Sequence, residues 1–256
     1  MGKNIAKRKL EKDKPVLGAF LGFYSPHVVE MFGYAGFDFV IIDREHGNIS
    51  AQECEIMVRA AEVSNTMPFV RVPDNDRSSI LKTLDMGGMG IQVPMINNKE
   101  DAQKAVDFAK YSSKENSRGL TFSTRAAKYG ISVNKDKHIE DSNRESLVVV
   151  QIETRKAIEN LQEILTVEGV DVVFIGPSDL SQSLGYPGQV DHPEVDKTIR
   201  KTIEEIVKAG KTPGVFLGNI KDAEKWIGMG VKYLACGGPS IMSMGIREYV
   251  SEFEKI

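Results

Sequence analysis

The sequence has few of the residues that mark secreted, thiolate-metal or membrane proteins. Its 256 residues include two cysteines, Cys54 and Cys236, which belong to no CxxC motif and no Cys/His ligand spacing. Isolated cysteines in apolar surroundings are typical of buried free thiols in a reducing compartment. No apolar window approaches the roughly 20 residues that a membrane helix needs, and the first residues lack the apolar segment of a signal peptide. We therefore expect a cytoplasmic protein with no membrane partner.

A strong charge of one sign is absent as well. The 33 lysines and arginines nearly balance the 36 aspartates and glutamates, and the net charge is -3. Basic residues are scattered, whereas a nucleic-acid-binding protein gathers them on one face, so we expect no nucleic-acid partner. The short basic segment at the start, residues 1–14 (MGKNIAKRKLEKDK), is typical of a solvated, partly helical arm. A subunit contact or an anion site is the alternative for this arm.

The sequence does contain a regular alternation of two patterns. Short runs rich in Val, Ile, Leu and Phe are bounded by Gly or Pro and are followed by segments of helical periodicity. The eight runs are residues 15–23, 37–43, 67–72, 90–96, 146–153, 170–176, 212–218 and 232–238. Apolar strands that alternate with helices predict a parallel sheet, either doubly wound or closed into a barrel. Eight units in about 250 residues favour a single-domain (β/α)8 TIM barrel over residues 15–256.

The expected helices have polar starts and glycine stops. They span residues 51–64, 78–86, 100–111, 156–165, 193–209 and 221–228. The stretch 112–145 is polar and longer than an ordinary connection. It indicates either a lid or an insertion that contacts another subunit.

Ionisable and polar residues cluster where four of the expected strands end. Reacting groups of a barrel enzyme gather at the carboxyl ends of its strands, so this clustering predicts an enzyme. The residues are, in chain order, Asp43, Glu45, His46, Arg71, Gln151, Glu153 and Asp179.

Glu153 and Asp179 follow adjacent strands of the expected barrel, so both carboxylates can point into one mouth and share a divalent cation. Two carboxylates with open remaining positions suit Mg2+ or Mn2+ better than zinc. The alternative makes Glu153 a helix cap and Asp179 the cap of a turn. The stretch GPSDL, residues 176–180, can also offer the backbone amides of Ser178 and Asp179 to a carboxylate.

Arg71 and His46 are the candidates for charge stabilisation and proton transfer. The planar fork of Arg71 can hold a substrate carboxylate or a developing oxyanion, or it can form a structural ion pair with Asp43 or Glu45. His46 lies beside acids at a strand end, which is the setting expected of a general base. Taken alone, a histidine in a loop is more often a bystander.

Four long motifs carry a resemblance to a known family. They are FDFVIIDREHG (37–47), FVRVPDND (69–76) with LKTLDMGGMGIQVPMI (81–96) behind it, VVVQIETRKAIENLQEIL (148–165) and VEGVDVVFIGPSDLSQSLGYPG (167–188). From about residue 16 to residue 249 the chain resembles the HpcH/HpaI aldolase/citrate lyase family, specifically its class II, metal-dependent 2-oxo acid aldolases.

The resemblance implies an enzyme that reversibly cleaves a 4-hydroxy-2-oxo acid to pyruvate and an aldehyde. A divalent cation, Mg2+ or Mn2+ with Co2+ as a further alternative, would stabilise the enolate left after cleavage. Asp43 and Glu45 are expected to orient the base or to tune the surroundings of the metal. By the same resemblance, His46 is the base, Asp85 is the acid that raises the basicity of His46, and Arg71 stabilises the oxyanion. Glu153 and Asp179 are the metal ligands. Gln151 and the backbone amides of Ser178 and Asp179 contact the pyruvate part.

Two positions depart from the family's pattern. Arg44 stands where many relatives have glycine, and we expect either a solvated side chain or a cation at the mouth that changes the preferred aldehyde. Ser178 stands where relatives often have alanine, a change expected to be nearly neutral because the predicted contact is a backbone amide. Two alternatives to an aldolase remain, a related lyase or decarboxylase acting on oxaloacetate and a catalytically silent protein that binds a 2-oxo acid.

The family commonly forms hexamers, as trimers of dimers that exchange a C-terminal helix. The matching stretch here is residues 239–253, which is apolar on one face. The resemblance therefore implies a homo-oligomer in which Asp85 can reach the base of a neighbouring subunit.

Overall fold

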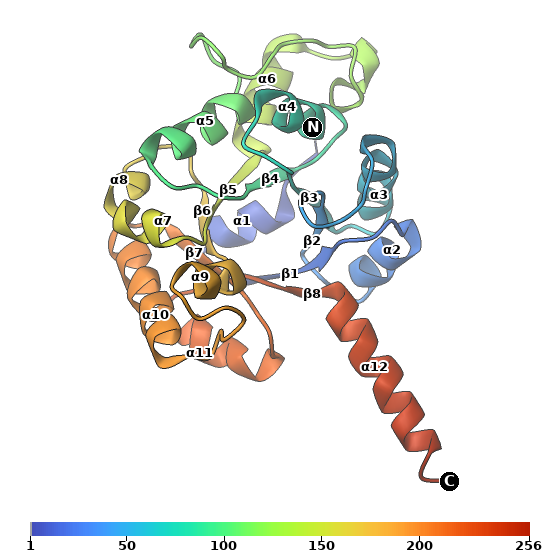
Figure 1. Ribbon diagram of the computed structural model, residues 1–256. Helices are drawn as coiled ribbons and strands as arrows, with labels where there is room; N and C mark the ends of the chain where they lie inside the picture. Colours follow the sequence, from blue (N-terminus) through green and yellow to red (C-terminus); the bar gives the residue numbers. More distant parts are fainter. Residues whose placement is uncertain (1) are drawn as a thin grey trace.

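Eight parallel strands close into a barrel that is surrounded by helices (Figure 1). The computed structural model describes residues 2–256. Each strand pairs with the next one along the chain, and β8 pairs with β1. The strands are β1 (Val16–Leu21), β2 (Phe39–Asp43), β3 (Met67–Arg71), β4 (Gly90–Val93), β5 (Leu147–Ile152), β6 (Val172–Ile175), β7 (Thr212–Phe216) and β8 (Tyr233–Gly237). Every strand lies inside one of the eight apolar runs, so the predicted (β/α)8 TIM barrel is confirmed.

The helices follow the predicted ranges closely, with one break. They are α1 (Ile5–Glu11), α2 (Pro26–Tyr34), α3 (Ala51–Val63), α4 (Arg77–Asp85), α5 (Lys99–Ala109), α6 (Lys135–Glu145), α7 (Arg155–Glu159), α8 (Leu161–Leu165), α9 (Pro177–Ser183), α10 (Pro193–Lys208), α11 (Ala223–Gly228) and α12 (Gly238–Phe253), with the 3-10 turns η1 (Arg125–Gly130) and η2 (Ile220–Asp222). The helix predicted at 156–165 is two helices because Asn160 leaves the helical conformation and donates its side-chain amide to the carbonyl of Asn97 at 2.9 Å. Within residues 2–256 no helix has both the length and the apolar character needed to cross a membrane.

Aromatic rings fill the barrel interior toward the amino ends of the strands. The ring of Phe39 stacks on those of Tyr233 and Phe69, with centroids 4.5 and 5.0 Å apart. Each of these rings stands in register with a glycine of a neighbouring strand, namely Gly18, Gly90 and Gly214. A Cβ atom at Gly18 would lie 2.0 Å from the Phe39 ring, so these glycines make room for the rings. Because this layer closes one end of the interior, a ligand can enter only from the carboxyl ends of the strands.

The N-terminal segment is partly helical and largely exposed, as predicted, but it is anchored to the barrel by two buried residues. Asn4 is fully buried, and its side-chain amide donates to the carbonyls of Met89 and Glu145, each at 2.9 Å. Ala6 of α1 is buried as well. The sequence did not predict this anchor, because local composition reports the many lysines of the segment but not the acceptors that the barrel presents to Asn4.

The polar stretch 112–145 contains structure that the sequence did not predict. It holds η1 and α6, and α6 escaped prediction because its sequence, KDKHIEDSNRE, has almost no apolar periodicity. The helix is anchored by a few buried residues, among them His138 and Glu145. The expectation that this stretch contacts another subunit is not tested by a single chain and stays a prediction.

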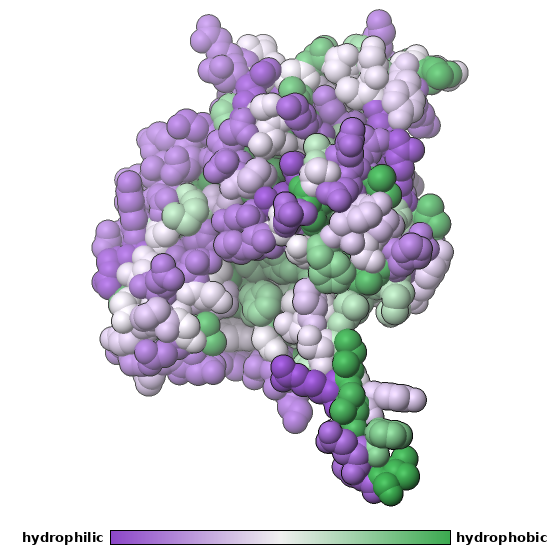
Figure 2. All heavy atoms as spheres, turned by 45° about the vertical axis from the view of Figure 1, so that its right-hand side comes forward, coloured by the Kyte–Doolittle hydropathy of each residue, from purple (hydrophilic) through white to green (hydrophobic). Residues whose placement is uncertain are grey.

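Helix α12 projects away from the barrel (Figure 1). Gly238 is its one buried residue, whereas the side chains of Met244, Tyr249 and Phe253 are 69%, 82% and 72% exposed. Figure 2 shows apolar side chains along the length of this protruding helix. The amphipathic helix predicted at 239–253 is therefore present, and its apolar face is uncovered in the single chain.

Candidate active site at the carboxyl ends of the strands

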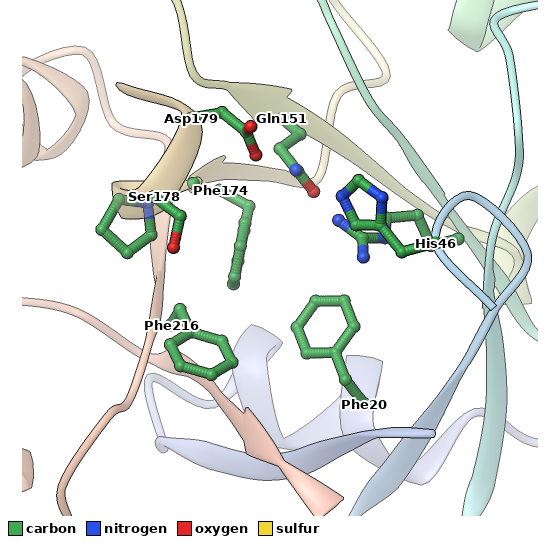
Figure 3. Close-up of a pocket in the computed structure, with 10 residues that line it drawn as sticks. Phe20, His46, Gln151, Phe174, Ser178, Asp179 and Phe216 are labelled. Atoms are coloured by element: carbon green, nitrogen blue, oxygen red, sulfur yellow. The ribbon is translucent and has the colours of Figure 1, made fainter. Parts of the chain in front are cut away.

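A cavity of about 200 Å³ opens at the carboxyl ends of the strands (Figure 3). Five predicted site residues line it, namely His46, Arg71, Gln151, Ser178 and Asp179, together with Phe20, Phe174, Gly176, Pro177 and Phe216. They come from β1, β3, β5, β6, β7, the loop after β2 and the start of α9. The barrel thus brings into one cavity residues that lie up to 196 positions apart in the sequence, from Phe20 to Phe216.

Glu153 lies directly behind the cavity wall and is 2% exposed. Its Oε1 accepts a hydrogen bond from the backbone N–H of Met95 at 2.7 Å, and its Oε2 accepts one from the side-chain amide of Gln151. Burial, together with the nearby carboxylates of Glu45 and Asp179, raises the pKa of Glu153 to about 7, against the lowering effect of the two hydrogen bonds. A buried carboxylate that is close to other carboxylates is stabilised in its charged form by a bound cation.

Two backbone features hold Glu153 in place. A Cβ atom at position 176 would lie 2.8 Å from Glu153 Oε2 and 3.3 Å from the Gln151 amide nitrogen, so Gly176 leaves room for both side chains. Met95 has a φ of 56°, a left-handed conformation that is costly for a residue other than glycine. Strain of this kind is typical of functional sites, and here it directs the backbone N–H of Met95 toward the carboxylate of Glu153.

The alternatives that made Glu153 a helix cap and Asp179 the cap of a turn are not supported. Thr154, not Glu153, caps α7 by accepting from the backbone N–H of Ala157. Helix α9 begins after Gly176 without a side-chain cap, and Asp179 is exposed in its first turn. The backbone amides of a first helical turn have no acceptor inside the helix, so those of Ser178 and Asp179 are available to a ligand.

The donor set fits a hard cation. Among residues 2–256 no three His, Cys, Asp or Glu side chains group closely enough to hold a metal by themselves. A cation bound by the carboxylates of Glu153 and Asp179 would have two protein ligands, and its other positions would be left to water or substrate oxygens. Mg2+ is bound in this way, by one or two carboxylates and several waters, whereas a zinc site uses three or four protein ligands rich in His and Cys.

Arg71 forms ion pairs with two acids and also lines the cavity. Its Nε and Nη2 donate to the two carboxylate oxygens of Asp43 at 2.9 and 2.6 Å, and its Nη1 lies 3.0 Å from Glu45 Oε2. The ion pair predicted as an alternative is confirmed. The guanidinium group also lines the cavity and lies 4.9 Å from the centre of the Phe20 ring. Its orientation is therefore fixed by two acids while its remaining N–H groups stay available to a ligand.

The loop after β2 places His46 at the cavity. The imidazole is exposed, whereas the backbone N–H groups of Glu45 and His46 donate to Asp43 Oδ1 at 3.1 and 3.3 Å. Asp43 thus shapes the loop that carries His46. Arg44 does not line the cavity, because its Nε donates to the carbonyl of Ile49 at 3.2 Å. The cation expected at the mouth as one alternative for Arg44 is not found there.

Asp85 lies away from His46 within the single chain. It ends α4 and forms an ion pair with Arg118 at 2.8 Å, and Arg118 packs over the ring of Tyr111. Asp85 lines a different cavity, beside Lys82 and other residues. Its predicted effect on His46 therefore stays a prediction that requires a second copy of the chain.

Several residues of the site were missed from the sequence. Phe20, Phe174 and Phe216 of the wall lie within apolar runs, and nothing in the sequence marks them as part of a cavity. Gln92 was also missed, since the only signal was one polar residue inside the apolar run GIQV. The role of Met95 could not be predicted, because no sequence pattern indicates a left-handed backbone conformation at a methionine.

Comparisons with known proteins agree with this geometry. Residues 17–241 match the family model described as HpcH/HpaI aldolase/citrate lyase. A 4-hydroxy-2-oxo-heptane-1,7-dioate aldolase of Shigella flexneri is 37% identical over 235 residues, which cover 91% of this chain and 86% of that protein. The crystal structure of an HpcH/HpaI aldolase/citrate lyase family protein from Burkholderia cenocepacia J2315 superposes with a TM-score of 0.92 at 27% identity, covering 98% of this chain and 100% of the other. The structure of the citrate synthase SbnG superposes with a TM-score of 0.84 at 28% identity, covering 97% and 98% of the two chains. The chain belongs to the HpcH/HpaI aldolase/citrate lyase family.

Proposed function

We propose that this protein is a divalent-metal-dependent aldolase that reversibly cleaves a 4-hydroxy-2-oxo acid to pyruvate and an aldehyde. The observation that carries the proposal is the convergence of His46, Arg71, Gln151 and Asp179 on one cavity with the buried carboxylate of Glu153 behind it. The class II aldolases of this family are generally dependent on a divalent metal. Relatives at 34–37% identity are named 4-hydroxy-2-oxo-heptane-1,7-dioate aldolases, which supports the substrate class.

Glu153 and Asp179 would hold the cation, for which we propose Mg2+ or Mn2+, with Co2+ as an alternative of similar size. A bound divalent cation supplies Lewis-acid stabilisation of the negative charge that develops on the 2-oxo oxygen during cleavage. The remaining N–H of Gln151 and the amides of Ser178 and Asp179 would bind the carboxylate of the pyruvate part. These groups orient the substrate so that its C4 hydroxyl faces His46.

His46 would act as the general base, directly or through a water. It takes the proton from the C4 hydroxyl, the C3–C4 bond breaks, and the electron pair of that bond passes to the pyruvate part as an enolate. Arg71, held rigid by Asp43 and Glu45, offsets the charge on the C4 oxygen in the transition state. The proton held by His46 then returns to complete pyruvate after the aldehyde has formed.

The proposal predicts pyruvate release from 4-hydroxy-2-oxo acids. Purified protein with Mg2+ or Mn2+ is incubated with substrates of several chain lengths, and pyruvate is measured by coupling to lactate dehydrogenase. Chelation with EDTA is expected to abolish the release, and added Mn2+ to restore it. Absence of pyruvate across all chain lengths would contradict the proposal. CO2 release from oxaloacetate, measured in parallel, separates the aldolase from the decarboxylase alternative, and ligand binding without any turnover would identify a silent binding protein.

We further propose that the chain assembles by exchanging α12 with a second copy, as trimers of such dimers. In a complete barrel the helix after β8 covers the outer face of the sheet, but α12 leaves that face open. The result is an apolar groove of about 410 Å³ whose lining includes Leu17, Phe37, Leu217, Cys236, Ile241 and Met244. The exposed apolar side chains of α12 suit the same groove of a second copy. Such an assembly would also provide a neighbour whose Asp85 reaches His46.

The assembly predicts a large particle that depends on α12. Six copies of a 28.3 kDa chain give about 170 kDa, which light scattering distinguishes from a monomer. A variant with Tyr249→Glu and Phe253→Glu places charges on the exposed apolar face and is expected to dissociate. Glu248→Ala, on the same helix, serves as the matched control and should keep the mass of the unaltered protein. A monomeric unaltered protein would contradict the proposed exchange.

We propose the cytoplasm as the location, as the sequence predicted. Cys54 and Cys236 are both buried free thiols, and burial raises the pKa of the first to about 12 and of the second to about 11. Thiols of this kind are typical of proteins in a reducing compartment.

A further inference from the structure

A chain of buried polar side chains runs from the aromatic layer of the barrel to Glu153. It begins at Tyr233, which is fully buried among the interior rings and whose hydroxyl donates to Gln92 Oε1 at 3.4 Å. The Nε2 of Gln92 donates to Gln151 Oε1 at 2.6 Å. The Nε2 of Gln151 then donates to Glu153 Oε2. Three hydrogen bonds thus join four side chains, which come from β8, β4, β5 and the position directly after β5.

The direction of this chain follows from the chemistry of its last member. An ionised carboxylate only accepts hydrogen bonds, so Gln151 must turn its NH2 group to Glu153 and its oxygen away. That oxygen is buried and requires a donor, which the NH2 group of Gln92 supplies. The oxygen of Gln92 requires a donor in turn, which the hydroxyl of Tyr233 supplies. Each amide is therefore held in one of its two orientations by the next side chain along.

The burial of Gln92 makes this chain unusual. Gln92 is 0% exposed in the middle of β4, a place where glutamine is rare and costly unless it is hydrogen-bonded. Both ends of its amide are satisfied by the two neighbours. Without a donor at position 92, the oxygen of Gln151 would stay buried and unpaired, or the amide would rotate and set its oxygen against Glu153.

We propose that Gln92 is a positioning residue which, together with Tyr233, holds the Gln151 amide with its N–H groups toward Glu153 and the cavity. Gln92 lines neither the cavity nor the proposed cation position, so it acts through Gln151. One N–H of the Gln151 amide donates to Glu153, and the other can donate to an oxygen of the pyruvate part. The inference rests on the proposed function for the identity of that ligand, but the orientation of the amide does not require turnover.

The test uses two variants that remove hydrogen bonds and keep volume. Gln92→Met has a similar length and no amide, and Tyr233→Phe loses only the hydroxyl. The Kd for Mn2+ and the Kd of the Mn2+-loaded protein for pyruvate are measured by calorimetry, with melting temperature as a separate readout. Gln92→Met is expected to raise the Kd for Mn2+ about 10-fold or more. Tyr233→Phe is expected to raise it about two- to tenfold, because its hydrogen bond is longer and one step further from Glu153.

The control is Thr202→Val, a buried polar residue of α10 that belongs to no part of the site. It should change the melting temperature and leave both Kd values unchanged. If the Gln92 and Tyr233 variants behave like this control, their role is structural and the proposal is overturned. If Gln92→Met does not fold, Tyr233→Phe decides the question by the same measurement.

Failure of the proposed function is recognised separately. An unaltered protein that binds no Mn2+ contradicts the metal site before any variant is compared. In that case crystal structures of the unaltered protein and of the Tyr233→Phe and Gln92→Met variants still test the inference. A rotated or displaced Gln151 in the variants supports it, and an unmoved Gln151 overturns it.

Discussion

The His46→Ala variant is expected to lose turnover by a factor of about 10² to 10⁴ and to keep its affinity for Mn2+. A positioned general base contributes a factor of this size to proton transfer. The imidazole stands on the loop after β2, across the cavity from Asp179 (Figure 3). The hydrogen-bond partners of Glu153 are Met95 and Gln151, so removal of the imidazole leaves the proposed ligands in place. The measurements are kcat from pyruvate release at saturating Mn2+ and the Kd for Mn2+ by calorimetry.

His192→Ala is the matched control for this variant. His192 stacks on Tyr186 at the start of α10 and does not line the cavity, so its loss should leave turnover unchanged. Unchanged turnover in His46→Ala would show that another group moves the proton. A large loss of Mn2+ affinity in that variant would instead identify His46 as a metal ligand.

The Glu153→Gln variant is expected to lose Mn2+ affinity by at least about 100-fold and to lose turnover with it. Mutation of a residue that only hydrogen-bonds to a metal ligand typically lowers metal affinity by about 10- to 100-fold. Glu153 is proposed as a ligand itself, so its loss should cost at least as much. The amide keeps the size of the side chain but removes its charge. It also sets a donor against the Gln151 amide that now donates to Glu153 Oε2. Calorimetry with Mn2+ measures the loss, and Glu204→Gln, at an exposed position of α10, is the control.

The same carboxyl predicts a pH dependence of metal binding. Burial raises the pKa of Glu153 to about 7, so in the metal-free protein the group carries a proton below that pH. A cation must displace this proton, and the Kd for Mn2+ should therefore rise about tenfold for each pH unit below 7 and level off above it. Glu153→Gln should lack this dependence. A flat profile in the unaltered protein, or an unchanged Kd in the variant, would remove Glu153 from the proposed ligands.

Much of the fold was predictable because the strand signal is local. In β5, for example, the run 146–153 contains the strand Leu147–Ile152 with a single residue to spare at each end. The same locality explains the failures. The lysines around Asn4 suggested solvent, and the acidic, polar sequence of α6 suggested a loop, because in both cases the anchoring partners lie far away in the chain.

The candidate site was predictable to the extent that it consists of residues at strand ends. His46, Arg71, Gln151 and Asp179 were placed at one mouth from their positions alone, and the cavity contains all four. Whether Arg71 would pair with acids or face a ligand was not decidable from spacing. In the folded chain it pairs with acids and also lines the cavity, because the register sets Arg71 opposite Asp43 while the end of β3 opens into the cavity.

The sequence by itself determined the strands, their order of appearance, the chemical types at their ends and the membership of a family. Only the tertiary structure decided which of these groups touch. It separated Asp85 from His46 within one chain, and it joined Gln92 to Glu153 through Gln151. The physical reason is that periodicity and composition report on neighbours along the chain, whereas barrel closure brings together side chains from strands that are distant in sequence. Hydrogen-bond direction and burial, which control the pKa of Glu153 and the orientation of Gln151, exist only after that closure.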